Sequence, residues 1–186
     1  MSAGHGHGHD AGHEGGNKRV ALLISVLALI LAFAETLGKS AQTSAVAHNI
    51  EALNLWNFFQ AKTIRQTVLR TAAEEVEAAG ASEAQKKQAG RWKETAQRYQ
   101  SEPETGEGRE QLSARAKEAE KKREQSMAAY HHYELASAAV QIAIVVASAS
   151  IIAGIAALAW LGAALGLVGV AFCVIGFFYP TAVHLF

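Results

Sequence analysis

Apolar residues are concentrated in two runs that a long polar segment separates. The first run covers residues 20–37 and is close to the roughly 20 residues that a helix needs to cross a bilayer. The second run covers residues 136–178, which as one helix would be about 65 Å long against a hydrocarbon core of about 30 Å, so it accommodates two spans. The pattern predicts an all-α protein with three transmembrane helices and a long extramembrane helical hairpin or stalk between the first and second.

The same pattern divides the chain into five parts. We expect a disordered His/Gly-rich tail, a first transmembrane helix, an extramembrane helical domain, a transmembrane hairpin with helices at about 136–156 and 160–179, and a C-terminal tail. Their expected bounds are 1–17, 18–38, 39–135, 136–179 and 180–186.

Local signals predict three helical stretches in the polar segment. Residues 39–79 contain neither Gly nor Pro, so helix should continue out of the first span. Ser82 and Gln85 have the spacing of a capping box, which predicts a second helix. Residues 102–108 hold a proline, two glycines and three glutamates and should form a loop, after which helix resumes at Arg109.

Large apolar side chains occur on more than one side of the first stretch. At 100° per residue one stripe contains Val46, Ile50, Leu53, Ile64 and Val68, and we expect this stripe to face the antiparallel return helix. A second group points elsewhere and is a candidate contact with a neighbouring copy: Leu55, Trp56, Phe58 and Phe59. The alternative is that the middle helix around Trp92 covers this second group.

The predicted hairpin is poor in large residues. Small residues recur every four positions at Ala149, Ala153 and Ala157 and again at Gly162 and Gly166. In lipid this spacing allows helix backbones to approach closely, so these five positions are the candidate packing contacts.

Three polar residues of the predicted spans are candidates for an ion path. Glu35 is the one ionisable residue within a span, and Gln141 and Ser148 lie in the second. The competing interpretation is that Glu35 reaches the membrane interface and pairs with Lys39 one turn later, while the polar side chains make interhelical hydrogen bonds. Just before the second span, the run YHHYE at 130–134 is typical of amphipathic rings at a membrane boundary.

The N-terminal tail offers a candidate metal site of low specificity. Its histidines His5, His7, His9 and His13 alternate with glycine in a flexible segment. Imidazoles favour weak Zn, Ni or Cu binding, but a solvated tail or a purification sequence has the same composition. We expect no other cofactor.

Most charged residues lie in the polar segment, and their balance excludes some functions. The polar segment 39–134 holds 29 of the 34 charged residues, fifteen basic and fourteen acidic. This balance gives no basic face for nucleic acid. No Gly-rich phosphate loop, catalytic triad or HExxH motif occurs, so we expect no enzyme. Charges flank both sides of the first span, which leaves the side of the polar segment undecided.

Four segments resemble a bacterial membrane-protein family catalogued as domain of unknown function 4337. They are NKRVALLI at 17–24, ETLGKSAQ at 35–42, the stretch 54–72 and ASASII at 147–152. The resemblance implies one N-terminal span, a helical insert, a C-terminal hairpin and a multi-pass location in the bacterial inner membrane. It implies no activity.

Three functions remain in competition. The first is a non-enzymatic homo-oligomer in the lipid bilayer whose helical, coiled-coil-like stalk mediates assembly or docks a protein partner. The second is a channel or ion-coupled subunit, because the layout is similar to that of ExbB and TolQ. The third is a metal-responsive membrane protein that uses the His-rich tail.

Overall fold

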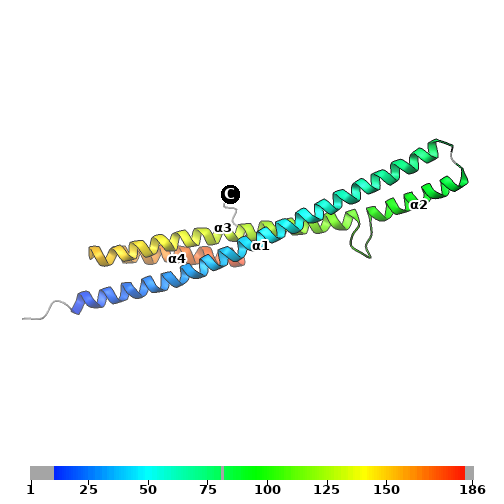
Figure 1. The fold of residues 1–186 in the computed structure, drawn as a ribbon. Helices are drawn as coiled ribbons and strands as arrows, with labels where there is room; N and C mark the ends of the chain where they lie inside the picture. Colours follow the sequence, from blue (N-terminus) through cyan, green and yellow to red (C-terminus); the bar gives the residue numbers. More distant parts are fainter. Residues whose placement is uncertain (1–10, 81, 183–186) are drawn as a thin grey trace, which may run out of the picture. The chain divides into compact units, whose positions relative to one another are not determined.

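The computed structural model describes residues 11–80 and 82–182, and every regular element in this part of the chain is a helix (Figure 1). The helices are α1 (Ala11–Ala78), α2 (Glu83–Gln100), α3 (Arg109–Ala153) and α4 (Ala156–Phe178). The helices α1, α3 and α4 are each long and apolar enough to cross a membrane. The predicted all-α fold with three such helices is therefore confirmed.

The start of α1 at Ala11 makes residues 11–17 helical, where the sequence predicted a tail without regular structure. Of the candidate metal ligands, His5, His7 and His9 lie outside the described residues. His13 lies on α1, but its side chain is also outside the described part of the chain.

The chain forms two compact units. The insert unit is Ser44–Glu124, and the apolar unit contains the described residues up to Thr43 and from Gln125. Both divisions fall inside helices, because α1 and α3 each contribute to both units.

The expected local signals set the helix ends in the insert unit. Gly80 follows α1 with φ +68°, a left-handed conformation that favours glycine. The Ser82 backbone N–H donates to Gln85 Oε1 at 2.9 Å, as the capping box predicts, and α2 follows. The loop between α2 and α3 and the start of α3 at Arg109 are also as predicted.

In the insert unit, α1 packs antiparallel against α3 through a face that we did not predict. The core contains Ala52, Leu55, Leu112, Ala116 and Ala119, with Trp56 and Phe59 packed against it. The stripe expected to face the return helix is instead exposed: Val46, Ile50, Leu53, Ile64 and Val68 are 53–65 % exposed. That prediction is wrong. Leu55, Trp56 and Phe59 make the contact with α3 instead, because these large side chains pack against small alanines of α3.

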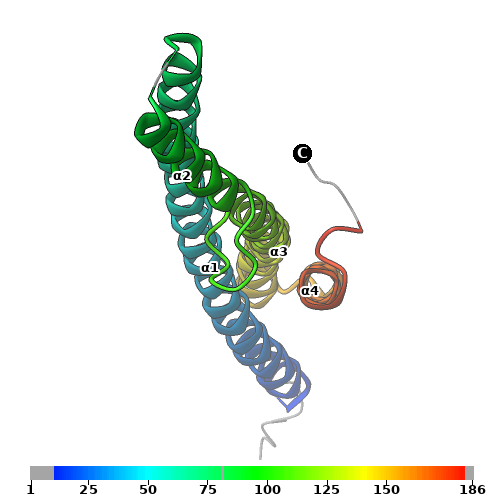
Figure 2. The same ribbon diagram turned by 90° about the vertical axis from the view of Figure 1, so that its right-hand side faces the viewer.

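The apolar unit is built on the α3–α4 turn and on α1. Gly154, with φ +69°, lies between Ala153 and the start of α4 at Ala156, so the turn is shorter than expected. Figures 1 and 2 show α4, in orange and red, folding back along α3. A core of Leu27, Val140, Ala143 and Ala147 joins α1 to α3.

Candidate functional site

Glycines on one side of α4 bring the helices of the apolar unit into close contact. Gly162, Gly166, Gly169 and Gly176 are the buried residues of α4. A Cβ at Gly162 would lie 2.9 Å from the Ala143 carbonyl oxygen. This part of the fold is a packing surface of small residues.

The α3 side of this contact differs from the alanine series that the sequence indicated. Ala136, Val140, Ala143 and Ala147 are fully buried. In contrast, Ala149 is half-buried, and Ala153 and Ala157 are exposed near the turn. The buried positions alternate in steps of four and three, a spacing that was readable in the sequence and that we did not use.

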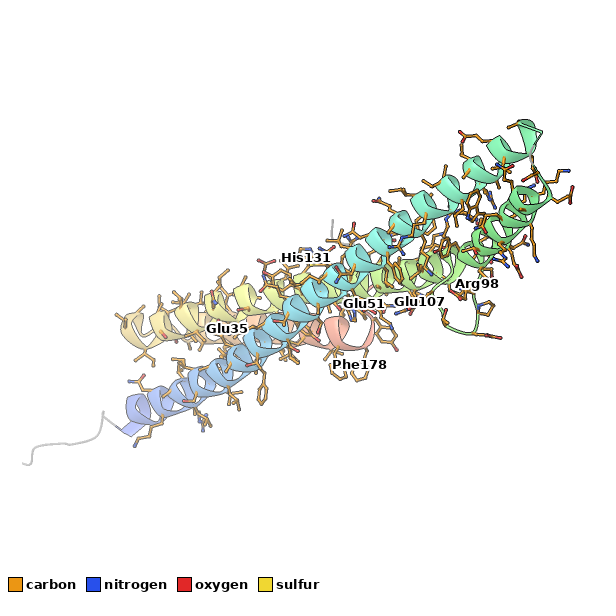
Figure 3. The ribbon with its side chains drawn as sticks, turned by 45° about the vertical axis from the view of Figure 1, so that its right-hand side comes forward. Glu35, Glu51, Arg98, Glu107, His131 and Phe178 are labelled. Atoms are coloured by element: carbon orange, nitrogen blue, oxygen red, sulfur yellow. The ribbon has the colours of Figure 1, made fainter. Side chains whose placement is uncertain are left out.

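A polar groove lies between α1 and α3 in the apolar unit. Its volume is about 500 Å³, and its polar lining includes Glu35, Lys39, Glu134 and Gln141. Gly38 contributes to the close approach of the two helices, since a Cβ there would lie 3.4 Å from the Tyr133 Cβ. Figure 3 shows Glu35 on α1.

The structure brings two of the three candidate ion-path residues together. Gln141 Nε2 donates to Glu35 Oε1 at 3.4 Å and to Ser137 Oγ at 3.3 Å. Ser148 Oγ donates to the Ile144 carbonyl oxygen at 2.8 Å, within its own helix. The contact between Glu35 and Gln141 therefore does not include Ser148, whose hydroxyl is engaged one turn back on α3.

Glu35 and Lys39 both line the groove, but no ion pair joins them in the described part of the chain. The expected pairing of these two residues is thus not formed. Glu134, the second carboxylate of the groove, lies 3.6 Å from His131 Nδ1.

One buried cation, Lys62, holds the loop of the insert unit. Lys62 is 6 % exposed, and its Nζ lies 3.6 Å from Glu102 and 3.7 Å from Glu107. The same ammonium stands over the rings of Tyr99 and Phe58, at 5.0 and 5.4 Å from their centroids. These contacts fasten the α2–α3 loop to α1, and Lys62 has a structural role that the sequence did not reveal.

The candidate oligomer contacts are used largely within the insert unit. Leu55 is buried in the core, and Trp56 and Phe59 pack against this core. The Trp56 and Phe59 rings meet each other edge to face, with centroids 5.4 Å apart. Trp56 Nε1 donates to Glu120 Oε1 at 2.8 Å. Phe58 remains 37 % exposed and contacts Lys62. The core residues that cover Leu55, Trp56 and Phe59 come from α3 and not from α2, the helix around Trp92.

The surface of α1 in the insert unit carries an uncharged face. At 100° per residue it occupies a sector of about 120°. We call the following eleven residues the uncharged face: Val46, Ile50, Leu53, Asn54, Asn57, Gln60, Ala61, Ile64, Val68, Thr71 and Ala72. Ten of them are exposed and Ala72 is half-buried, so this face has no partner in the described part of the insert.

In the described part of the chain, no three His, Cys, Asp or Glu side chains are grouped to hold a metal ion. The fold and these surfaces define a helical protein with three helices long and apolar enough to cross a membrane.

The chain belongs to the family described as a domain of unknown function (DUF4337), whose model matches residues 16–179. A search of curated proteins and a search of solved structures found no match.

Proposed function

We propose that this protein is a non-enzymatic membrane protein that self-associates through the uncharged face of α1. The observation that supports the proposal is the exposure of five large aliphatic side chains on that face, each 53–65 % exposed. These side chains form two groups, 46–53 and 64–68, with uncharged polar residues between them on the same face. Large apolar side chains exposed together on one face of a helix favour an interaction site there. The contact that we first expected at Leu55 to Phe59 is replaced by this one.

The partner that fits this face is a second copy of the chain. Copies inserted in one membrane share an orientation, so their α1 helices run parallel and a symmetric contact brings each residue beside its own counterpart. Charged residues would then meet like charges, which is unfavourable. None of the eleven residues is charged, and Glu51 and Arg65 lie outside the sector.

The spacing of the face supports a long, continuous contact. Val46, Asn57 and Val68 are eleven residues apart, and so are Leu53 and Ile64. An eleven-residue period is about 3.67 residues per turn, so the face stays on one side of a nearly straight helix. Asn57 lies near the centre of the face, and a polar residue in an apolar helix contact favours one register.

Crosslinking through single cysteines tests the proposal. In a Cys173→Ala background, Leu53→Cys and Ile64→Cys should each form a disulfide-linked dimer in membranes. Glu51→Cys is the matched control, because it is exposed on the same helix two residues from Leu53 but lies outside the face. Equal crosslinking at Glu51 and Leu53, or none at Leu53 and Ile64, would reject this contact.

A charge at the centre of the face provides the second test. Ile64→Lys should convert the dimer into a monomer in mild detergent, measured by sedimentation, because two lysines would be brought together without a counter-charge. Arg65→Gln, one position along the helix, should leave the dimer intact. Far-UV circular dichroism should show unchanged helix content in both variants, since both side chains are exposed.

A further inference from the structure

The polar groove between α1 and α3 carries charges of both signs on a small surface. Glu35 and Lys39 come from consecutive turns of α1, and Glu134 and Gln141 come from α3. Gln141 uses its amide nitrogen for its contacts with Glu35 and Ser137, and its amide oxygen adds a neutral acceptor. Tyr130 also lines the groove and adds a phenol that donates or accepts.

The groove is placed where the apolar runs end. Glu35 lies two residues before the end of the first run at Leu37, and Glu134 lies two residues before Ala136, where the second begins. In a bilayer this level is occupied by lipid head groups and not by acyl chains. The ligand present there at the highest concentration is a phospholipid head group.

We propose that the groove binds a phospholipid whose head group carries a primary ammonium and a phosphate. The ammonium donates hydrogen bonds to oxygen acceptors, and the Glu35 carboxylate with the neighbouring Gln141 amide supplies them. Glu134, which also lies 3.6 Å from His131 Nδ1, adds a second carboxylate to the lining of the groove. Lys39 supplies the positive charge for the phosphate. A head group with only a negative charge would meet two carboxylates, and a quaternary ammonium would have no N–H to donate.

Two observations favour a ligand over a self-contained ion pair. The carboxylate of Glu35 and the ammonium of Lys39 share the groove without an ion pair between them. The groove also has a volume of about 500 Å³, so it holds several non-hydrogen atoms beside these groups. A zwitterionic head group fills this space and satisfies both charges.

Native mass spectrometry of the full chain in detergent tests the proposal. The protein is mixed with dioleoyl-phosphatidylethanolamine, dioleoyl-phosphatidylcholine or dioleoyl-phosphatidylglycerol at equal concentrations, and the first bound lipid is counted. The ethanolamine lipid should bind about tenfold more tightly than either other lipid, because charge-assisted hydrogen bonds are lost in both. Equal binding of the three lipids would overturn the proposal.

Variants assign the binding to the groove. Glu35→Gln combined with Glu134→Gln should remove the preference for ethanolamine over choline, and Lys39→Gln should weaken both lipids. Glu51→Gln combined with Glu118→Gln is the matched control, because it removes two exposed carboxylates from the insert unit and should keep the preference. An unchanged preference in the Glu35 and Glu134 double variant would place the binding elsewhere.

A last arm separates the lipid from a soluble ligand of the same chemistry. Free phosphoethanolamine at millimolar concentration should fail to displace the bound lipid, because the acyl chains add burial that the head group lacks. Displacement at that concentration would show that the groove serves a soluble ligand and would refute the lipid assignment. The proposal does not depend on self-association, so Ile64→Lys should keep the lipid preference.

Discussion

A glycine of α2 and a glycine of α4 allow one chemical change, Gly to Ala, to be tested with opposite expected signs. Gly90 lies in the middle of α2, and a Cβ built there meets nothing within 4 Å. Gly162 lies in α4, where the new Cβ would lie 2.9 Å from the Ala143 carbonyl oxygen and 3.1 Å from the Ala147 Cβ. The helix propensity gained is the same at both sites, so the difference measures packing alone.

The magnitudes follow from two terms. Replacing a helical glycine by alanine stabilises a helix by about 0.8–1 kcal/mol, so Gly90→Ala should raise the free energy of unfolding by nearly this amount. At Gly162 the neighbours are two backbone atoms and the Ala147 Cβ, none of which can rotate away, and overpacking costs about 1–3 kcal/mol. After the propensity gain is subtracted, the net cost is about 0–2 kcal/mol, and we expect Gly162→Ala near the upper end because three atoms lie within 3.2 Å of the new Cβ.

Two neighbouring glycines of α4 should give results that differ from each other. At Gly166 the new Cβ would meet the terminal Cδ2 of Leu27, a flexible side-chain end that moves aside. Gly166→Ala should therefore change stability little. At Gly169 the obstacles are a methyl group of Val140 and the Ala136 carbonyl oxygen at 3.1 Å. Because the χ1 angle of valine is stiff, Gly169→Ala should be destabilising, close to the Gly162 variant.

Cys173 provides the assay, because it is the one cysteine of the chain and lies half-buried on α4. Packing covers only part of this side chain, so its rate of reaction with a thiol reagent in mild detergent, compared between variants, reports how much further α4 opens from its neighbours. Gly162→Ala should accelerate labelling about tenfold, the equivalent of 1.4 kcal/mol, and Gly166→Ala much less. Gly90→Ala should leave the labelling rate unchanged while raising the urea midpoint of the insert. Labelling that is equally fast in the Gly162 and Gly166 variants would refute the reasoning.

Two further predictions concern the insert unit. Lys62→Met should lower the free energy of unfolding by about 2–3 kcal/mol in urea titrations, because two glutamates lose a buried cation that also stands over two rings. The control Lys86→Met removes an exposed pair and should cost less than about 0.5 kcal/mol; equal losses would contradict the role of burial. Hydrogen bonds from Gln100 and Ser101 hold the pKa of the Glu110 carboxyl below its ordinary value of 4.5. The stability that this carboxylate contributes is complete above the unfolded pKa and is lost as the pH falls through the lower folded pKa. Glu110→Gln should therefore make the melting temperature of the insert depend less on pH below about pH 4.5. The same pH dependence in the variant and the natural protein would argue against this role of Glu110.

Much of the fold was predictable because its signals are local. The apolar runs at 20–37 and 136–178 fixed the three long apolar helices by length alone. Gly80, the Ser82 and Gln85 pair and the loop before Arg109 act within a few residues of one another. Such signals need no knowledge of distant contacts, and the structure agrees with them.

The packing face of α1 was not predictable in the same way. Its core side includes Lys62 and Gln66, which are 6 % and 2 % exposed, so that side looked polar in the sequence. Their burial depends on partners 30 to 45 residues away, since Gln66 Nε2 donates to the Ala96 carbonyl oxygen and Lys62 pairs with Glu107. A polar residue is stable in the protein interior when it has a hydrogen-bond or ion-pair partner, and hydrophobic periodicity carries no information about that partner.

The same limit applies to the groove. Glu35 and Gln141 are more than a hundred residues apart, and their contact at 3.4 Å depends on the packing of α1 against α3. The sequence identified both as polar residues of apolar segments but gave no reason to pair them. Gly38 was a usable sign, because a glycine inside a long helix often marks a close helix contact.

The energy available on the uncharged face explains why a membrane would matter to self-association. Burying the exposed half of each large aliphatic side chain is worth about 1 kcal/mol, or about 10 kcal/mol for the ten side chains of two copies. Association in free solution costs about 4–15 kcal/mol in lost translation and rotation, so this face alone would give a weak complex. Insertion of the apolar helices in a bilayer would fix the direction of α1 and confine the copies to two dimensions, which would raise their effective concentration before any contact forms. For the proposed self-association, a face of this size would then be enough for copies that share a bilayer, whereas in water it would give only a weak complex.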